Sequence, residues 1–161
     1  MDPLAKLLPP GNVLVDLDAS SKKRAFEQAG QLFEHNQGLN RNTIFGSLFA
    51  REKLGSTGLG QGVAIPHGRI KGLREAVGAL IKLKNPVPFD APDGMPVSLV
   101  FILLVPEQAT DLHLQLLGEL AQMFSDKAFR DRLLGCRAAD EMYRLIAGWT
   151  GHDADHRSEA V

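Results

Sequence analysis

A chain of 161 residues with 44% hydrophobic and 23% charged residues has the size and composition of one globular domain. Eighteen lysines and arginines against 19 aspartates and glutamates leave a net charge of −1, without the basic excess that nucleic-acid and anionic-membrane binders carry. We therefore predict one domain over residues 1–161, with no nucleic-acid partner and no membrane insertion.

The first half of the chain predicts one strand and two helices. Residues 13–17 are expected to form a short strand. A helix then follows, with Ser20 or Ser21 as its N-cap and Gly38 at its end, because apolar residues recur at steps of three and four along it. Asn42 is the expected N-cap of a second helix that runs to Gly55. Arg51 lies in its last turn, where a cation complements the helix dipole, so Arg51 has a purely structural explanation.

The rest of the chain predicts a loop, two strands and three helices. Five of the 16 glycines fall between positions 55 and 68, which indicates a long structured loop in which only residues 63–65 suit a strand. Residues 77–83 and 97–105 are β-branched apolar runs typical of buried strands, joined by a turn-rich linker. Helices follow, the first capped by Thr110, the second by Ser125 and ended by Gly135, and the last over residues 142–149.

Helices at both ends of a strand-rich middle predict an α/β protein: one three-layer α/β/α domain with a mixed central sheet. We place its core at about residues 7–149 and expect residues 150–161 to be a frayed tail whose removal leaves function intact. The lone Cys136 cannot form an intramolecular disulfide, and no signal peptide or membrane span is visible in the sequence. We expect a cytoplasmic protein.

Several kinds of functional site are excluded because the sequence motifs that they require are missing. There is no Gly-x-x-x-x-Gly-Lys-[Ser/Thr], and Gly58-x-Gly60-x-Gly62 lacks the spacing and the preceding strand of a dinucleotide fingerprint. Ser56 does not lie in a Gly-x-Ser-x-Gly elbow. The only close histidine pair, His152 and His156, lies in the expected tail, where any metal binding would be adventitious. We predict no metal and no cofactor.

His67 is the strongest candidate for chemistry. Pro66 stiffens the chain before it and Gly68 leaves its far side uncovered, although a histidine after a strand is more often structural. His113 falls at the third position of the helix capped by Thr110, where the dipole favours a neutral ring and attracts anions. With Arg51, the two histidines and the glycine loop would suit a phosphoryl group. Sequence spacing alone does not show that these residues meet.

These residues match a known pattern. The stretch Arg51-Glu52-Lys53-Leu54-Gly55-Ser56-Thr57-Gly58-Leu59-Gly60-Gln61-Gly62-Val63-Ala64-Ile65-Pro66-His67-Gly68 resembles the signature of mannitol/fructose-type IIA domains of the bacterial phosphoenolpyruvate:sugar phosphotransferase system. Asp111-Leu112-His113-Leu114 is similar to that family's second motif, and the resemblance extends from about Leu7 to Trp149. Residues 19–25 and the absence of adjoining IIB and IIC domains look more like the nitrogen-regulatory branch than a sugar permease.

The resemblance implies a phosphohistidine carrier with an α/β/α fold. His67 would accept a phosphoryl group, as tele-phosphohistidine, from an HPr-type phosphocarrier protein, with His113 and Arg51 lining the site and no cofactor. Regulatory targets in this family include potassium-transport proteins and sensor kinases. We expect a low rim for phosphate and partner binding, formed by Ser56, Thr57, Gly58, Gly60, Gly62 and Gly68. Two alternatives stay open: a sugar-specific IIA that passes phosphate to a separate IIB, and a binding module that has lost transfer.

Overall fold

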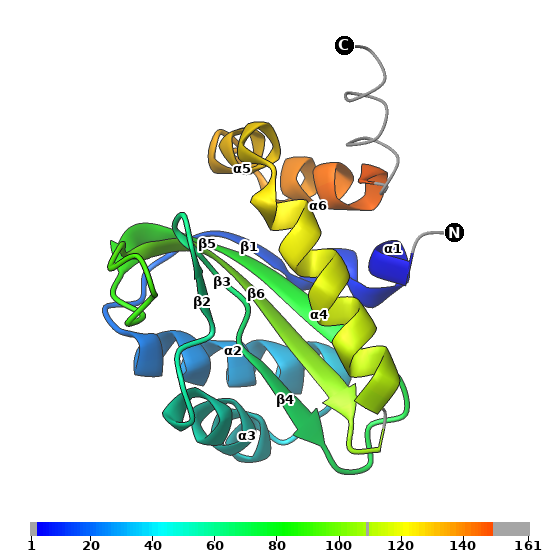
Figure 1. The fold of residues 1–161 in the computed structure, drawn as a ribbon. Helices are drawn as coiled ribbons and strands as arrows, with labels where there is room; N and C mark the ends of the chain where they lie inside the picture. The colour runs from blue at the N-terminus through cyan, green and yellow to red at the C-terminus, as the bar shows by residue number, and fades with distance from the viewer. Residues whose placement is uncertain (1–2, 109, 150–161) are drawn as a thin grey trace.

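The computed structural model describes residues 3–108 and 110–149, which form a six-stranded mixed sheet with helices on both sides (Figure 1). The strand order is β1 (Val13–Leu17), β5 (Val77–Val87), β6 (Val97–Pro106), β3 (Val63–Ala64) and β2 (Gly58–Gly60), and β4 (His67–Ile70) also pairs with β6. β5 is antiparallel to β6, whereas β3 and β4 are both parallel to it. The predicted α/β class with a mixed sheet is confirmed.

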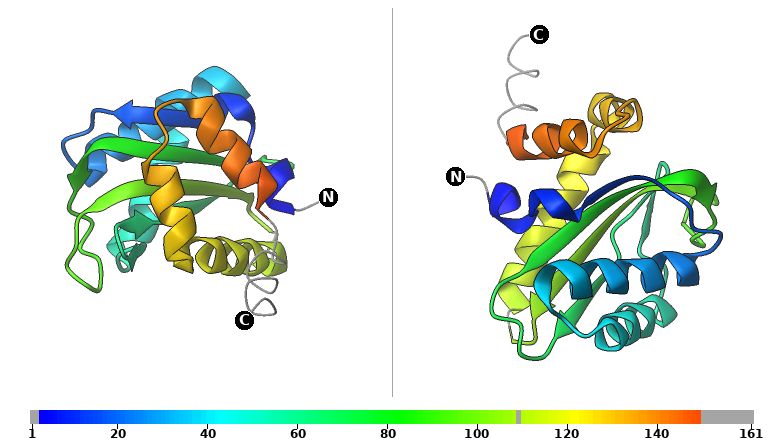
Figure 2. Two further views of the ribbon diagram at one scale, coloured as in Figure 1. Left: turned by 90° about the horizontal axis from the view of Figure 1, so that it is seen from above. Right: turned by 180° about the vertical axis from the view of Figure 1, so that it is seen from behind.

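Side chains of β6 alternate between two hydrophobic cores. Leu99, Phe101 and Leu103 pack on the side covered by α1 (Pro3–Leu7), α4 (Thr110–Ser125), α5 (Lys127–Leu134) and α6 (Ala139–Gly148). Val100 and Ile102 pack on the opposite side, against α2 (Lys22–Gln37) and α3 (Arg41–Lys53). The two views of Figure 2 show these helix layers on either side of the sheet, which confirms the three-layer arrangement.

Several predicted helix boundaries are correct. The Ser21 side chain accepts a hydrogen bond from the Arg24 backbone N–H and caps α2, and Gly38 ends that helix in the left-handed conformation with φ of 70°. Each residue suits its end of the helix: the Ser21 hydroxyl accepts a hydrogen bond from an otherwise unpaired N–H, and glycine tolerates positive φ.

Three predicted caps are wrong by one or two residues. Asn40, rather than Asn42, caps α3, because its side-chain oxygen accepts hydrogen bonds from the backbone N–H groups of Asn42 and Thr43. Ser125 is the last residue of α4, and Asp126 caps α5. Thr110 is already the first residue of α4, so His113 is the fourth helical residue rather than the third. The short α1 was not predicted.

The strand expected at residues 63–65 is present as β3, and the glycine-rich segment contains more regular structure than predicted, since β2 and the start of β4 also fall within residues 55–68. β3 and β4 follow one another along the same edge of β6 and are separated only by Ile65 and Pro66. Pro66 has no N–H to donate, but its carbonyl accepts a hydrogen bond from Leu103 N at 3.0 Å. The interruption therefore fixes His67 as the first residue of β4.

Two further expectations concern the extent of the chain. Within the described residues no helix has the length and apolar character of a membrane span. The tail predicted over residues 150–161, with His152 and His156, lies outside the described residues, and the single domain over residues 1–161 stays a prediction.

Candidate functional site

His67 is half-buried, and the structure determines which of its ring nitrogens carries the proton. Its Nδ1 lies 2.9 Å from the carbonyl oxygen of Ile65. Because a carbonyl oxygen can only accept a hydrogen bond, the proton lies on Nδ1, and Nε2 is left with its lone pair. Burial lowers the pKa of His67 below its ordinary value of 6.5, against the opposing effect of the hydrogen bond to the Ile65 carbonyl. The charge of Arg51 adds to the lowering, and the charge of Glu52 opposes it. The neutral ring therefore presents Nε2 as a nucleophile.

His113 lies against His67. The two ring centroids are 5.0 Å apart in an edge-on arrangement. Burial lowers the pKa of His113, with further contributions from His67, Arg69 and Arg51. Its Nε2 is buried and has no hydrogen-bond partner among the described residues. A buried nitrogen without a protein partner, next to a nucleophilic imidazole, suits a hydrogen bond to an oxygen of an incoming group.

Arg51 lies in the last turn of α3, as predicted, and its guanidinium is held by the loop that follows. Its Nη1 donates a hydrogen bond to the carbonyl of Gly55 at 2.8 Å. Its charge contributes to the lowered pKa of both histidines, which places the cation near both rings. In the described part of the chain Arg51 forms no salt bridge with a carboxylate. Its charge is therefore available to an anionic group.

A surface depression of about 320 Å³, here called the His67 hollow, brings most of the predicted site together. Its lining comes from the end of α3, the glycine-rich segment and one face of α4: Arg51, Ser56, Thr57, Gly58, Leu59, Ile65, His67, Leu117, Gly118 and Ala121. His67 and Arg51 thus share a shallow site with three of the six predicted rim residues. His113 contacts the ring of His67 but does not line the hollow. Gly60, Gly62 and Gly68 do not line it.

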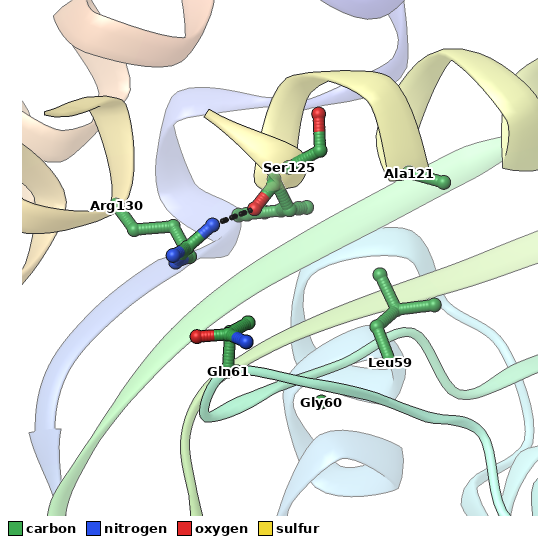
Figure 3. A pocket seen from close by; sticks show the side chains of 7 residues that line it. Leu59, Gly60, Gln61, Ala121, Ser125 and Arg130 are labelled. Atoms are coloured by element: carbon green, nitrogen blue, oxygen red, sulfur yellow. Dashed lines mark hydrogen bonds between the residues drawn. The ribbon is translucent and has the colours of Figure 1, made fainter. Parts of the chain in front are cut away.

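Next to it lies a second depression of about 460 Å³, the Arg130 hollow, which shares Leu59 and Ala121 with the first. Gly60 and Gln61 form one wall and α4 the other (Figure 3). Arg130 is buried at its end and donates a hydrogen bond to the Phe124 carbonyl at 2.8 Å. That carbonyl lies in the last turn of α4, so Arg130 stabilises a helix terminus.

The hydroxyl groups of the predicted rim both donate hydrogen bonds to residues outside the loop. Ser56 Oγ donates to the Phe89 carbonyl and accepts from Gly58 N. Thr57 Oγ1 donates to Glu52 Oε1 at 2.6 Å. In this structure both hydroxyls hold the loop in shape.

The rim glycines have two different physical roles. Gly60 and Gly62 have φ of 91° and 78° at the β2–β3 turn, a conformation that other residues rarely adopt. Gly68 is buried under α3, where a Cβ would run into the side chain of Ser47. Gly58 is similarly close to Ala91, with 2.8 Å between the two Cβ positions if Gly58 had one. Two glycines thus permit the turn and two permit close packing.

Sequence reasoning missed two charged residues that support this loop. The Glu52 side chain is 3% exposed and lies 3.2 Å from Lys22 Nζ, a residue on α2. Lys22 also reaches Asp90 and the Phe89 carbonyl, next to the Ser56 contact. The only sequence signal for a role of Glu52 was its place within the matched motif. A contact between residues 22 and 52 gives no local sequence pattern, because the two residues are 30 positions apart.

Exposed leucines lie near the site. Leu54 and Leu114 are 85% and 65% exposed, and Leu59 and Leu112 are 45% and 40% exposed. Leu54 follows α3, Leu59 lines the His67 hollow, and Leu112 and Leu114 flank His113. Exposed apolar side chains around a shallow site are typical of protein docking surfaces. Among the described residues no group of three or more histidine, cysteine, aspartate or glutamate side chains could hold a metal ion.

Several known proteins are similar to this chain over most of its length. A family model described as phosphoenolpyruvate-dependent sugar phosphotransferase system, EIIA 2, matches residues 6–149. A nitrogen regulatory protein of Pseudomonas aeruginosa is 46% identical over 144 residues, which cover 89% of this chain and 94% of the relative. The crystal structure of nitrogen regulatory protein IIA-Ntr from Neisseria meningitidis matches with a TM-score of 0.85 and 52% identity, over 90% of this chain and 99% of that one. The crystal structure of IIA mannitol from Escherichia coli matches with a TM-score of 0.73 and 23% identity, over 86% and 98%.

Proposed function

The chain belongs to the EIIA 2 family of the phosphoenolpyruvate-dependent sugar phosphotransferase system, and on this premise we propose that it accepts a phosphoryl group on Nε2 of His67 from an HPr-type phosphocarrier protein. It is a phosphotransfer component of the regulatory kind, since 46% identity to a nitrogen regulatory protein far exceeds the 23% identity to IIA mannitol. The sugar-specific alternative is correspondingly less supported.

The observation that carries the proposal is the hydrogen bond from His67 Nδ1 to the Ile65 carbonyl. It fixes the tautomer in which Nε2 is unprotonated, and the lowered pKa keeps the ring neutral at physiological pH. In the transfer, the P–N bond to the donor imidazole breaks while a P–Nε2 bond forms. The donor ring leaves with the electron pair, and His67 retains its proton on Nδ1, where the Ile65 carbonyl stabilises the positive charge that develops on the ring.

Phosphoryl transfer of this kind needs positioning and charge stabilisation more than covalent assistance. Arg51 lies close enough to influence the pKa of His67 and offsets charge on the phosphoryl oxygens. His113, with its unpartnered Nε2, donates a hydrogen bond to one of those oxygens in the tautomer that carries the proton there. No cofactor takes part in this scheme.

The donor is a protein because the site is shallow and bordered by exposed leucines. Leu54 and Leu114 supply the apolar contacts, and the glycine-rich turn keeps the rim low enough for two imidazoles to approach. Once phosphorylated, His67 carries an added charge of about −2, which changes the partners that can bind. We propose that this charge regulates binding to target proteins, which in this family include potassium-transport proteins and sensor kinases, in the cytoplasm.

The test is incubation with labelled phosphoenolpyruvate, enzyme I and an HPr-type carrier. We expect acid-labile label on the wild type and none on His67→Ala, whereas His113→Ala should be labelled slowly. Undiminished label on His67→Ala would refute the assignment. An unlabelled wild type that still binds its targets would indicate a binding module without transfer, and rapid passage of label to a IIB cysteine would indicate a sugar-specific component.

A further inference from the structure

Glu52 is a buried carboxylate whose oxygens are fully engaged. Its Oε2 accepts hydrogen bonds from Thr57 N at 3.0 Å and Lys22 Nζ at 3.2 Å, and its Oε1 accepts one from Thr57 Oγ1 at 2.6 Å. The side chain is 3% exposed. A carboxylate is costly to bury unless its partners are well placed, so these partners define one geometry for the loop.

The contacts of Glu52 continue through the backbone of two residues, Thr57 and Ile65, to the ring of His67. Thr57, held by Glu52, accepts a hydrogen bond on its carbonyl from Ile65 N at 3.0 Å. Ile65 in turn accepts the hydrogen bond from His67 Nδ1 at 2.9 Å. These contacts run without a gap from Glu52 at the end of α3, through Thr57 just before β2 and Ile65 just after β3, to His67 at the start of β4.

We propose that Glu52 is a positioning residue for the phosphoryl acceptor: through Thr57 and Ile65 it fixes the Ile65 carbonyl that holds the proton on His67 Nδ1, and so keeps Nε2 free to attack. The buried carboxylate holds Thr57 by both its N–H and its hydroxyl, and charge-assisted hydrogen bonds of this kind are stronger than neutral ones. The position of Thr57 then fixes the carbonyl that accepts from Ile65 N, and so the backbone of Ile65. The part of this inference that concerns transfer rests on the proposed function. The part that concerns the tautomer does not.

Glu52 also has a structural role, since its contact with Lys22 ties α3 to α2. Loss of that role would lower stability without moving the proton on His67. A positioning role predicts a change in the imidazole itself. The test therefore needs a spectroscopic measurement on His67 beside the rate.

The experiment compares the wild type with Glu52→Ala, Glu52→Gln and a matched control, Glu34→Ala. Glu34 lies on α2 with its side chain 37% exposed, and it pairs with Arg41 at 2.8 Å, so its loss also removes a glutamate and an ion pair. Imidazole ¹⁵N shifts at a pH where both site histidines are neutral report the tautomer. Single-turnover phosphoryl acceptance from the phosphorylated carrier reports the rate.

We expect Nδ1–H in the wild type and in Glu34→Ala. In Glu52→Ala we expect a substantial fraction of the Nε2–H tautomer and a rate lower by about ten- to a hundredfold, the usual effect of a misplaced reacting group. Glu52→Gln, which can still accept from Thr57 N, should lie between the two. If Glu52→Ala does not fold, Glu52→Gln decides the question by the same two measurements.

An unchanged His67 tautomer in the folded Glu52 variants would overturn the inference, whatever happens to the rate, because stability alone would then explain the residue. A changed tautomer with an unchanged rate would equally overturn its role in transfer. If the wild type accepts no phosphoryl group, the proposed function is refuted, while the ¹⁵N spectra still decide whether Glu52 sets the tautomer.

Discussion

Replacing Arg51 should lower the rate of phosphoryl acceptance without unfolding the protein. The guanidinium is held by one hydrogen bond of 2.8 Å to a neutral carbonyl, that of Gly55, and forms no salt bridge within the described residues. No carboxylate of the described residues neutralises its charge, which therefore acts on the phosphoryl oxygens. Loss of one preorganised donor of this kind typically costs about 3–4 kcal/mol of barrier, or two to three orders of magnitude in rate.

We expect Arg51→Ala to lose that factor in single-turnover acceptance from the phosphorylated carrier. Arg51→Lys should lose less, because it retains the charge but not the planar fork that binds two oxygens at once. The pKa of His67 should rise in Arg51→Ala, since the nearby cation contributes to its lowering. Arg24→Ala, an exposed position on α2, is the matched control. A folded Arg51→Ala with a rate within about threefold of the wild type would refute the role given to Arg51.

Three other changes test the site and its supports. Burial lowers the pKa of His67, so below pH 6.5 the unfolded chain binds more protons than the folded protein. Both the acceptance rate and the free energy of unfolding should therefore fall as the pH drops below 6.5 through the folded-state pKa. A rate that declines already above pH 6.5 would contradict this. Gly68→Ala should lower the free energy of unfolding by about 1–3 kcal/mol in denaturant titrations, and Ser47→Ala in the same chain should recover part of the loss, because the added Cβ meets Ser47. Leu114→Asp should raise KM for the phosphorylated carrier with little effect on kcat, whereas Leu134→Asp on α5 should change neither; equal effects would show that Leu114 is not at the docking surface.

Much of the fold followed from local patterns. Helix α2 could be placed because the Ser21 hydroxyl caps its first turn and Gly38, which has no Cβ, tolerates the left-handed conformation at its end. The cap of α3 was misplaced because Asn40 and Asn42 are both good caps, and only the observed contacts distinguish them. In the glycine-rich segment only β3 has a local pattern typical of a strand. β4 depends on pairing with β6, some 35 residues later, and β2 depends on pairing with β3, which no local pattern reveals.

The site shows the same division. The motif indicated His67, His113 and Arg51, and the structure brings them together. The tautomer of His67 could not be predicted, because it depends on the position of one backbone carbonyl. Glu52 could not be assigned a role for the same reason: its contacts with Lys22 and Thr57 exist only once the helices pack.

The proposed transfer leaves the phosphoryl group on Nε2 of His67. The most direct measurement is ¹⁵N and ³¹P NMR of the uniformly ¹⁵N-labelled protein after incubation with phosphoenolpyruvate, enzyme I and an HPr-type carrier. We expect phosphorus coupled to Nε2 of His67, with Nδ1 still protonated and bonded to the Ile65 carbonyl. Phosphorus coupled to Nδ1 of His67, or to either ring nitrogen of His113, would contradict the proposed transfer.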